Sequence, residues 1–167
     1  VYLGIQKGQV TQDGLTGLNN RRRLDQYMWE LDERSGERET CCYLLMDVNK
    51  FKKVNDTYGH VTGDEVLRLV AEQLKRTFGN MQAFLARYGG DEFVVIVKGK
   101  TQDEMDVIIH QTQENVNAIA WGADTPWQLS ISIGCAMRGE QGKQKSHELL
   151  ALADERMYRQ KKGIQDR

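Results

Sequence analysis

The sequence predicts a single α+β domain in which helices cover a central antiparallel β-sheet. Apolar runs of strand length alternate with longer amphipathic segments along the 167 residues. Two of these runs are adjacent and are joined by a Gly-Gly turn, so they are expected to pair antiparallel. After a first helix the order is strand, helix, strand, strand, helix, strand, helix, whose core is a βαββαβ unit.

Each element is predicted from its local pattern. Polar cap-type residues precede the first helix, and apolar positions at helical spacing mark all four long helices. The first strand is apolar throughout, which is typical of a central strand buried on both faces, and the last shows alternation. Helices are expected at 21–34, 64–78, 101–120 and 146–162, with a short helical turn at 50–54. Strands are expected at 41–46, 83–88, 93–97 and 127–137.

The hairpin at Gly89-Gly90 carries two acidic residues directly after its turn. Adjacent glycines allow positive φ at both central positions, which predicts a tight turn. Asp91 and Glu92 begin a strand that is otherwise apolar. Since neighbouring strand residues point to opposite faces, we expect at most one of these carboxylates to face a given site. An exposed acidic turn is the plain structural alternative.

Composition and charge exclude several classes of protein. The chain is 40% hydrophobic and 28% charged, as in ordinary globular domains. A net charge of −1 gives no general attraction to nucleic acid or to an anionic membrane, and no apolar run approaches the ~18 residues of a membrane span. Cys41, Cys42 and Cys135 are predicted to be small core residues of a reduced, cytoplasmic protein. Any phosphate binding must therefore come from local groups.

Five segments together resemble the GGDEF family of diguanylate cyclases, in the order and at the spacing of that family. They are 13–22, 47–56, 59–64, Arg87-Tyr-Gly-Gly-Asp-Glu-Phe93 and Ser132-Ile-Gly134. The resemblance implies a palm-like fold akin to nucleotidyl cyclases and polymerases, over a domain spanning 13–167. Residues 1–12 are then expected to be the tail of a linker helix from an upstream sensory module.

The resemblance implies that two GTP molecules condense to cyclic di-GMP and two pyrophosphates, with Mg²⁺ or Mn²⁺ as cofactor. The metal ligands of the family map onto Asp47, the backbone carbonyl of Val48, and Asp91. Such oxygen ligands suit hard divalent cations. Asp91 also matches the residue proposed to help deprotonate the attacking hydroxyl, and Glu92 matches a position that is usually acidic. The structural alternative for Asp47 is a cap on the following turn.

By the same resemblance, the turn after the first strand is expected to bind phosphates. The backbone at Lys50 and Phe51 would contact them, since exposed N–H groups in such a turn can cradle phosphate. Lys52 would stabilise the charge of the transition state. The alternative is that Lys52 and Lys53 are merely solvated.

Asn55 and Asp64 match the guanine-recognising pair of the family. A carboxylate can accept hydrogen bonds from N1–H and the exocyclic amine of guanine, and an amide can donate to its acceptors. Adenine lacks this donor pattern, so Asp64 favours GTP. His60 is expected to contact the substrate, with a structural histidine as the alternative.

Three departures from the family pattern affect these expectations. The second acid that usually follows the metal aspartate is Asn49 here, and we expect activity to survive that change. Lys161, with Lys162 as the fallback, matches the lysine that contacts the terminal phosphates, but Ile164 stands where the family has an arginine nearby. The Arg-x-x-Asp that binds inhibitory product corresponds to 80–83, Asn-Met-Gln-Ala, which predicts no primary product-inhibition site.

Because each GGDEF domain binds one GTP, the resemblance makes a second GGDEF domain the partner for catalysis, with no nucleic acid and no membrane contact by the domain itself. The isolated domain is expected to be monomeric and slow, since an upstream module would supply proximity. The cytoplasmic domain of a membrane-anchored protein is one such setting. Two alternatives remain: a degenerate domain that binds GTP or a protein without turnover, and a polymerase-like nucleotidyltransferase, which would need a basic groove.

Overall fold

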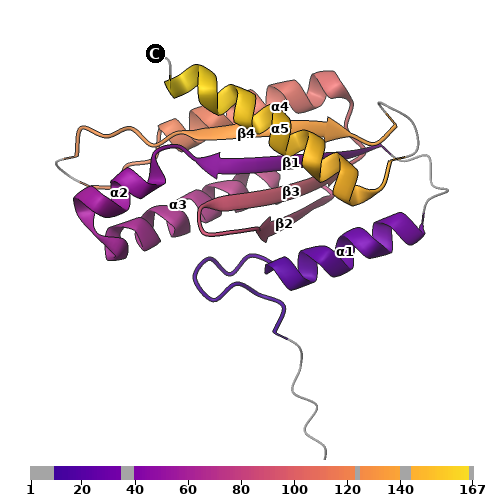
Figure 1. Ribbon diagram of the computed structural model, residues 1–167, viewed down its shortest axis with the longest axis horizontal. Helices are drawn as coiled ribbons and strands as arrows, with labels where there is room; N and C mark the ends of the chain where they lie inside the picture. The colour runs from indigo at the N-terminus through magenta and orange to yellow at the C-terminus, as the bar shows by residue number, and fades with distance from the viewer. Residues whose placement is uncertain (1–9, 35–39, 123–124, 140–143, 166–167) are drawn as a thin grey trace, which may run out of the picture.

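The computed structural model describes residues 10–34, 40–122, 125–139 and 144–165, and contains the predicted layers of helix and sheet (Figure 1). Its helices are α1 (Arg21–Glu33), α2 (Phe51–Tyr58), α3 (His60–Phe78), α4 (Gln102–Asn117) and α5 (Ser146–Gln165). Its strands are β1 (Cys41–Val48), β2 (Ala83–Arg87), β3 (Glu92–Lys98) and β4 (Ile131–Met137). The predicted linker helix falls on residues 1–9, outside the described residues, and on 10–12, which are not helical.

The sheet confirms the βαββαβ unit. Its strand order is β2-β3-β1-β4, and every neighbouring pair is antiparallel. All eight residues of the central strand β1 are buried, as its uninterrupted apolar run predicted. The register aligns Asp47 with Glu92 of β3 on one side and with Ser132 of β4 on the other. The last residues of β1 therefore lie between the hairpin and the start of β4.

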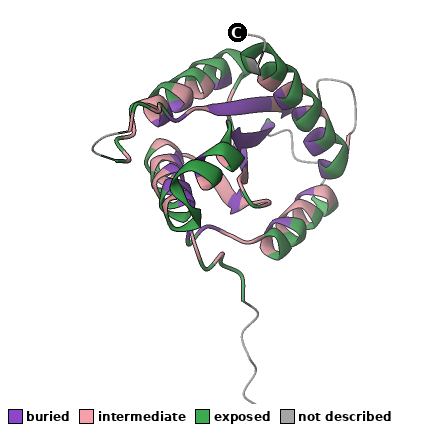
Figure 2. Ribbon diagram, turned by 60° about the vertical axis from the view of Figure 1, so that its left-hand side comes forward, coloured by how far each residue is buried: buried purple, intermediate pink, exposed green. Residues whose placement is uncertain are grey.

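Helices cover both faces of the sheet, and β1 contributes to both cores (Figure 2). Leu44 and Met46 pack with the apolar side chains of α3 and α4. Tyr43 and Leu45 pack in a second core with those of α1 and α5. Because side chains alternate along a strand, Asp47 falls on the same face as Leu45, beneath α5. This alternation decides which helix can reach the Asp47 carboxylate.

The boundary between α2 and α3 differs from the prediction. The short turn expected after β1 is an eight-residue helix, and α3 begins at His60 instead of being capped by Asp64. Gly59 ends one helix and precedes the next with φ 89° and ψ 164°, a conformation that glycine adopts without the steric cost of a Cβ. Asp64 consequently lies inside α3, and the sharp bend at Gly59 sets the angle between the two helices.

The hairpin and β4 also differ in detail. Neither Gly89 nor Gly90 has a positive φ, because the connection is a four-residue loop, 88–91, closed by hydrogen bonds from Tyr88 N (2.8 Å) and Gly89 N (3.3 Å) to the Glu92 carbonyl. β4 begins at Ile131 and not at 127, because its first residue pairs with Val48, where β1 ends.

Two further features concern composition. Cys41 and Cys42 are buried in the core, as predicted, and Cys135 is partly buried. Within the described residues, no helix combines the length and the apolar character that crossing a membrane would require.

Close packing of α5 on β4 gives a stability prediction. A Cβ placed on Gly134 would lie 1.8 Å from the Ala153 carbonyl oxygen and 2.4 Å from the Met157 backbone nitrogen. Backbone atoms of a packed helix cannot move aside as the end of a side chain can. We therefore expect Gly134→Ala to lower the free energy of unfolding, measured by urea titration, by about 2–4 kcal/mol. Gly14→Ala, whose added methyl meets nothing within 4 Å, should change it by less than about 0.5 kcal/mol. Equal effects of the two substitutions would contradict this account of the packing.

Candidate functional site

Three carboxylates converge where β1 ends beside the hairpin loop. Asp47 pairs in register with Glu92, and the Val48 N–H donates to the Asp91 carbonyl at 3.2 Å. Asp47 is 7% exposed, whereas Asp91 and Glu92 are partly buried. Asp91 lies in the loop before β3, so the strand alternation that we expected to separate Asp91 from Glu92 does not apply to this pair. Both acids therefore feel the charge of Asp47.

The clustering raises the pKa of two of these acids. Burial, followed by the negative charge of Asp47, raises the pKa of Asp91 to about 6, against an opposing effect of Lys161. Burial and then the charges of Asp47 and Asp154 raise the pKa of Glu92, which Lys161 and Arg21 partly offset. For these two acids, the effects of burial and of neighbouring negative charges thus outweigh the effect of the nearby positive charges.

Lys161 supplies the nearest positive charge. Its Nζ lies 2.9 Å from Asp47 Oδ2, reaching from the last turns of α5 to the end of β1. Lys162, the fallback for the phosphate-binding lysine, instead lies over the ring of Tyr158, with Nζ 4.8 Å from the ring centroid. The structure thus brings Lys161, and not Lys162, into the carboxylate cluster.

The cluster could hold a divalent cation. The second oxygen of Asp47, Oδ1, is buried and accepts no hydrogen bond within the described residues, which leaves a costly unsatisfied acceptor. Within the described ranges, no three His, Cys, Asp or Glu side chains form a ready metal cage. Two carboxylates and the Val48 carbonyl would instead be a partial oxygen set of the kind that Mg²⁺ completes with water and phosphate. The residues present therefore fit such a metal.

Arg87 organises the hairpin loop, a role that we did not predict. Its guanidinium donates to the carbonyls of Gly89 at 3.2 Å and Gly90 at 2.8 Å, and forms an ion pair with Asp13 at 3.2 Å. Arg21, at the start of α1, stacks over Tyr88 with 3.9 Å to the ring centroid. The Arg-Tyr before the two glycines was the available signal, but only the fold shows which carbonyls the arginine binds.

The connection from β1 into α2 is strained at one residue. Lys50 has φ 56° and ψ 29°, the left-handed conformation that costs a non-glycine residue roughly 1–2 kcal/mol. Its side chain forms no capping hydrogen bond to the helix. Phe51 packs against the main core, and Lys52 and Lys53 are exposed. The structure thus places the predicted phosphate-binding turn directly after the carboxylate cluster.

Asn49 ties this connection to β4. Its Nδ2 donates to Ser130 Oγ at 2.9 Å, and its Oδ1 accepts from Ser132 Oγ at 2.7 Å. An acid at this position could not donate to Ser130 in the same way. The departure from the family pattern therefore serves a structural role in this chain, because both ends of the amide are occupied by β4 and the residue before it.

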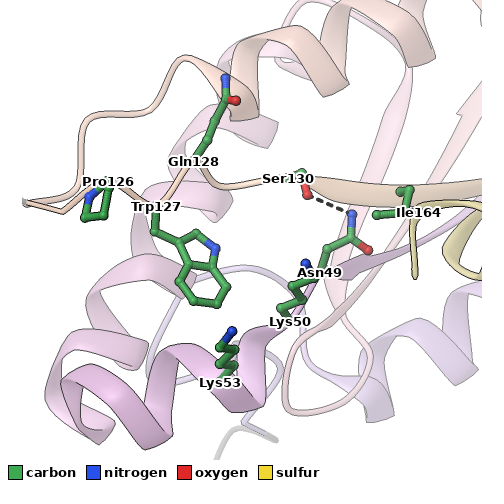
Figure 3. Close-up of a pocket in the computed structure, with 8 residues that line it drawn as sticks. All are labelled: Asn49, Lys50, Lys53, Pro126, Trp127, Gln128, Ser130 and Ile164. Carbon is green, nitrogen blue, oxygen red and sulfur yellow. Dashed lines mark hydrogen bonds between the residues drawn. The ribbon is translucent and has the colours of Figure 1, made fainter. Parts of the chain in front are cut away.

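A cavity of about 330 Å³ opens beside this connection (Figure 3). The ring of Trp127 points toward Lys53, whose Nζ lies 5.0 Å from the ring centroid. The described residues that line the cavity include two lysines and no carboxylate, which suits an anionic group. They are Asn49, Lys50, Lys53, Pro126, Trp127, Gln128, Ser130 and Ile164.

The remaining predicted residues form a second group at the junction of α2 and α3. Asn55 lies in α2, and its Oδ1 is buried with no hydrogen-bond partner among the residues that the structure covers. His60 is the first residue of α3 and is exposed, and its contact with the substrate stays a prediction. Asp64 is also exposed, one turn further along α3. The predicted site residues therefore divide into a carboxylate–lysine group and a group between two helices.

Comparison with known proteins decides the family. The model of the family described as "Diguanylate cyclase, GGDEF domain" matches residues 10–167. The chain belongs to the GGDEF family. Among curated proteins, it is 38% identical to the probable diguanylate cyclase DgcI of Escherichia coli over 156 residues, and 28% identical to the diguanylate cyclase DgcP of Pseudomonas aeruginosa over 167 residues. These matches cover 90% and 99% of this chain but only 31% and 25% of the two relatives.

Solved structures confirm the GGDEF fold. The GGDEF domain of DgcB from Caulobacter crescentus, in complex with c-di-GMP, aligns with a TM-score of 0.81 at 30% identity, over 92% of this chain and 91% of that one. The diguanylate cyclase SiaD of Pseudomonas aeruginosa, in complex with its activator SiaC, aligns with a TM-score of 0.83 at 26% identity, over 92% and 59% of the two chains. The predicted α+β fold and family are therefore confirmed.

The raised pKa of Asp91 gives this GGDEF domain a predicted pH dependence of stability. In the folded state the pKa is about 6, above the ~3.9 of an unfolded aspartate. The folded state therefore binds more protons between these values, and the free energy of unfolding should fall as pH rises from about 4 to about 7. In EDTA at pH 7.5 we expect Asp91→Asn to be more stable than the parent by about 1–2 kcal/mol, with the difference vanishing near pH 4.

Urea unfolding of both proteins at the two pH values measures this difference. Asp103→Asn, at an exposed position in α4, is the matched control and should show little difference at either pH. A difference between the parent and Asp91→Asn that stays constant from pH 4 to pH 7.5 would contradict a titrating Asp91.

Proposed function

We propose that this GGDEF domain is a diguanylate cyclase that condenses two GTP molecules into cyclic di-GMP and two pyrophosphates. The observation that carries the proposal is the convergence of Asp47 and Asp91 at the end of β1. One Asp47 oxygen is buried and has no hydrogen-bond partner in the part of the chain that the structure describes, and burial together with the charge of Asp47 raises the pKa of Asp91. Perturbed carboxylates gathered at one edge of a rigid sheet are typical of a catalytic site.

Asp47, Asp91 and the Val48 carbonyl would hold Mg²⁺ or Mn²⁺. When bound, such a cation polarises phosphoryl oxygens and neutralises charge as pyrophosphate leaves. Asp91, whose pKa is raised to about 6 before metal binds, is the candidate to accept the proton of the attacking 3′-hydroxyl, with Glu92 beside it as a further acid. Asp47 and Glu92 lie on paired strands, and Arg87 holds the loop that carries Asp91, so little reorganisation would be needed during reaction.

The triphosphate would lie over the connection from β1 to α2. In this proposal the backbone at Lys50 and Phe51 contacts the phosphates and Lys52 stabilises the transition-state charge. Lys161, which pairs with Asp47, would turn to the terminal phosphates once a cation replaces it at the carboxylate. The neighbouring cavity, lined by Lys50 and Lys53 without a described carboxylate, is suited to those phosphates and would compensate for the missing arginine.

The guanine base would lie at the junction of α2 and α3. Asp64 has an exposed side chain and is free to accept from two guanine N–H groups, while Asn55 and His60 flank the same junction. Adenine has neither the N1–H nor the 2-amino group of guanine, so it would lose the two hydrogen bonds to Asp64, which favours guanine. This is the basis for proposing GTP as the substrate.

A second copy of the domain is required, because each copy holds one GTP and the two 3′-hydroxyls attack across the pair. The relatives are longer than this chain, which covers 25–42% of the first three. We infer that additional segments in such proteins raise the effective concentration of the second domain. The isolated domain would then turn over slowly at micromolar concentration.

The direct test is product formation. Purified domain at high concentration with GTP and Mg²⁺ should yield cyclic di-GMP by chromatography. Asp91→Asn should reduce the rate at least about 100-fold, since it removes a metal ligand and an acceptor for the proton. Asp103→Asn, a surface carboxylate of α4, should retain the parent rate.

Fusion to a dimeric coiled coil separates slow turnover from a lack of activity. If the fused domain still makes no cyclic di-GMP while binding GTP, the proposed cyclase is wrong and a GTP-binding module remains. Product from Asp91→Asn at the parent rate would overturn the role of the carboxylate cluster while leaving the activity intact.

The segment 80–83 gives a prediction about regulation. Met81, Gln82 and Ala83 provide neither a guanidinium nor a carboxylate for a dinucleotide, so the primary inhibitory product site should be absent. Initial rates measured with micromolar cyclic di-GMP added at the start should match those without it. A fall of several-fold would show that product binds an inhibitory site elsewhere.

A further inference from the structure

Gly63 occupies the tightest position between α2 and α3. A Cβ placed on it would lie 1.8 Å from Asn55 Oδ1, 2.9 Å from Asn55 Cγ and 3.3 Å from Phe51 Cζ. At distances below 3 Å, an added Cβ would force the Asn55 side chain to move. The Asn55 amide thus rests directly on the Cα of Gly63, in space that only glycine leaves open.

Backbone conformation does not account for a glycine here. Gly63 lies within α3, with its N–H bonded to the Gly59 carbonyl at 3.1 Å, and its φ is outside the left-handed region. In the interior of a helix, alanine is favoured over glycine because it restricts the unfolded chain more. Glycine at position 63 therefore destabilises α3 locally, but it leaves the space that the Asn55 side chain occupies.

The seated amide has an unmet hydrogen bond. Asn55 Oδ1 is buried and has no hydrogen-bond partner in the described part of the protein. It packs against Gly63, which has no side chain to donate a hydrogen bond. A buried acceptor without a donor is unfavourable by itself, and becomes favourable when a ligand brings an N–H to it. Asp64, next to Gly63 and exposed, places a second acceptor at the same junction.

We propose that Gly63 is a positioning residue for base selection. Because it lacks a side chain, Gly63 leaves room for the Asn55 amide to pack against α3. There the Asn55 amide and the Asp64 carboxylate would form hydrogen bonds to one edge of a planar base. This inference rests on the proposed binding of GTP at the α2–α3 junction. Any side chain at 63 pushes Asn55 outward and separates the two groups.

The substitution Gly63→Ala tests this without unfolding the domain. The atom in its way is the end of a mobile side chain, so the amide can swing aside while the helices keep their places. We expect a melting temperature equal to or above that of the parent. The Asn55 side-chain amide resonance in ¹⁵N-resolved NMR should nevertheless shift, because its surroundings change. Gly14→Ala, whose methyl meets nothing within 4 Å, should leave that resonance in place.

Nucleotide affinity is the second readout. By calorimetry, Gly63→Ala should weaken GTP binding about tenfold, as Asn55→Ala does, and should narrow the GTP-to-ATP preference by a similar factor. Because Gly63 acts through Asn55, the double variant Asn55→Ala/Gly63→Ala should bind GTP no more weakly than Asn55→Ala alone. If Gly63 served folding alone, the loss of GTP affinity caused by Gly63→Ala would instead add to the loss caused by Asn55→Ala.

These outcomes separate the inference from the proposed activity. A parent that binds GTP selectively but makes no cyclic di-GMP would overturn the cyclase and leave the role of Gly63 standing. An unmoved Asn55 resonance in Gly63→Ala, or fully additive losses in the double variant, would overturn the role of Gly63 whatever the activity. A parent with no affinity for GTP would overturn both.

Discussion

The antiparallel register between β1 and β3 is the constraint on which the site depends. It aligns Asp47 with Glu92 and brings the Val48 N–H to the Asp91 carbonyl at 3.2 Å. A slip of one residue would turn Asp47 away from α5 and toward the opposite core, because side chains alternate along a strand. Apolar packing on both faces of β1 prevents that slip. The hydrophobic core and the carboxylate cluster are therefore consequences of one pairing.

Around this register the structure concentrates unfavourable charge. The cluster holds three acids against the close ion pair of one lysine, Lys161, with Asp47, and the pKa values of Asp91 and Glu92 are raised by burial and by Asp47. Such an arrangement opposes folding, and it persists because the surrounding sheet and Arg87 fix the backbone. A bound cation would relieve this repulsion, which supports the metal site proposed for these carboxylates.

At the proposed base-binding end, available space matters more than charge. Gly59 bends the chain sharply between α2 and α3, and Gly63 lets the Asn55 amide pack into the angle so formed. Between the two ends, the strained Lys50 turns the backbone from β1 into α2. The residues proposed for catalysis and for base recognition thus lie on or directly beside helices and strands that a short connection joins, which keeps their separation fixed without a long loop.

The sequence by itself determined the family and the order of helices and strands, and it predicted the residues around which the site is proposed to form. Periodicity and five motifs suffice for these, because hydrophobic patterning and turn chemistry are local properties. It misplaced the start of α3, the conformation of Gly89-Gly90 and the first residue of β4, since ends of elements depend on which strand or helix lies alongside. Only the tertiary structure decided that Lys161 pairs with Asp47, that Arg87 holds the hairpin loop, and that Gly63 makes room for Asn55. Each of these contacts joins residues from different elements, and their geometry is set by packing that no local pattern encodes.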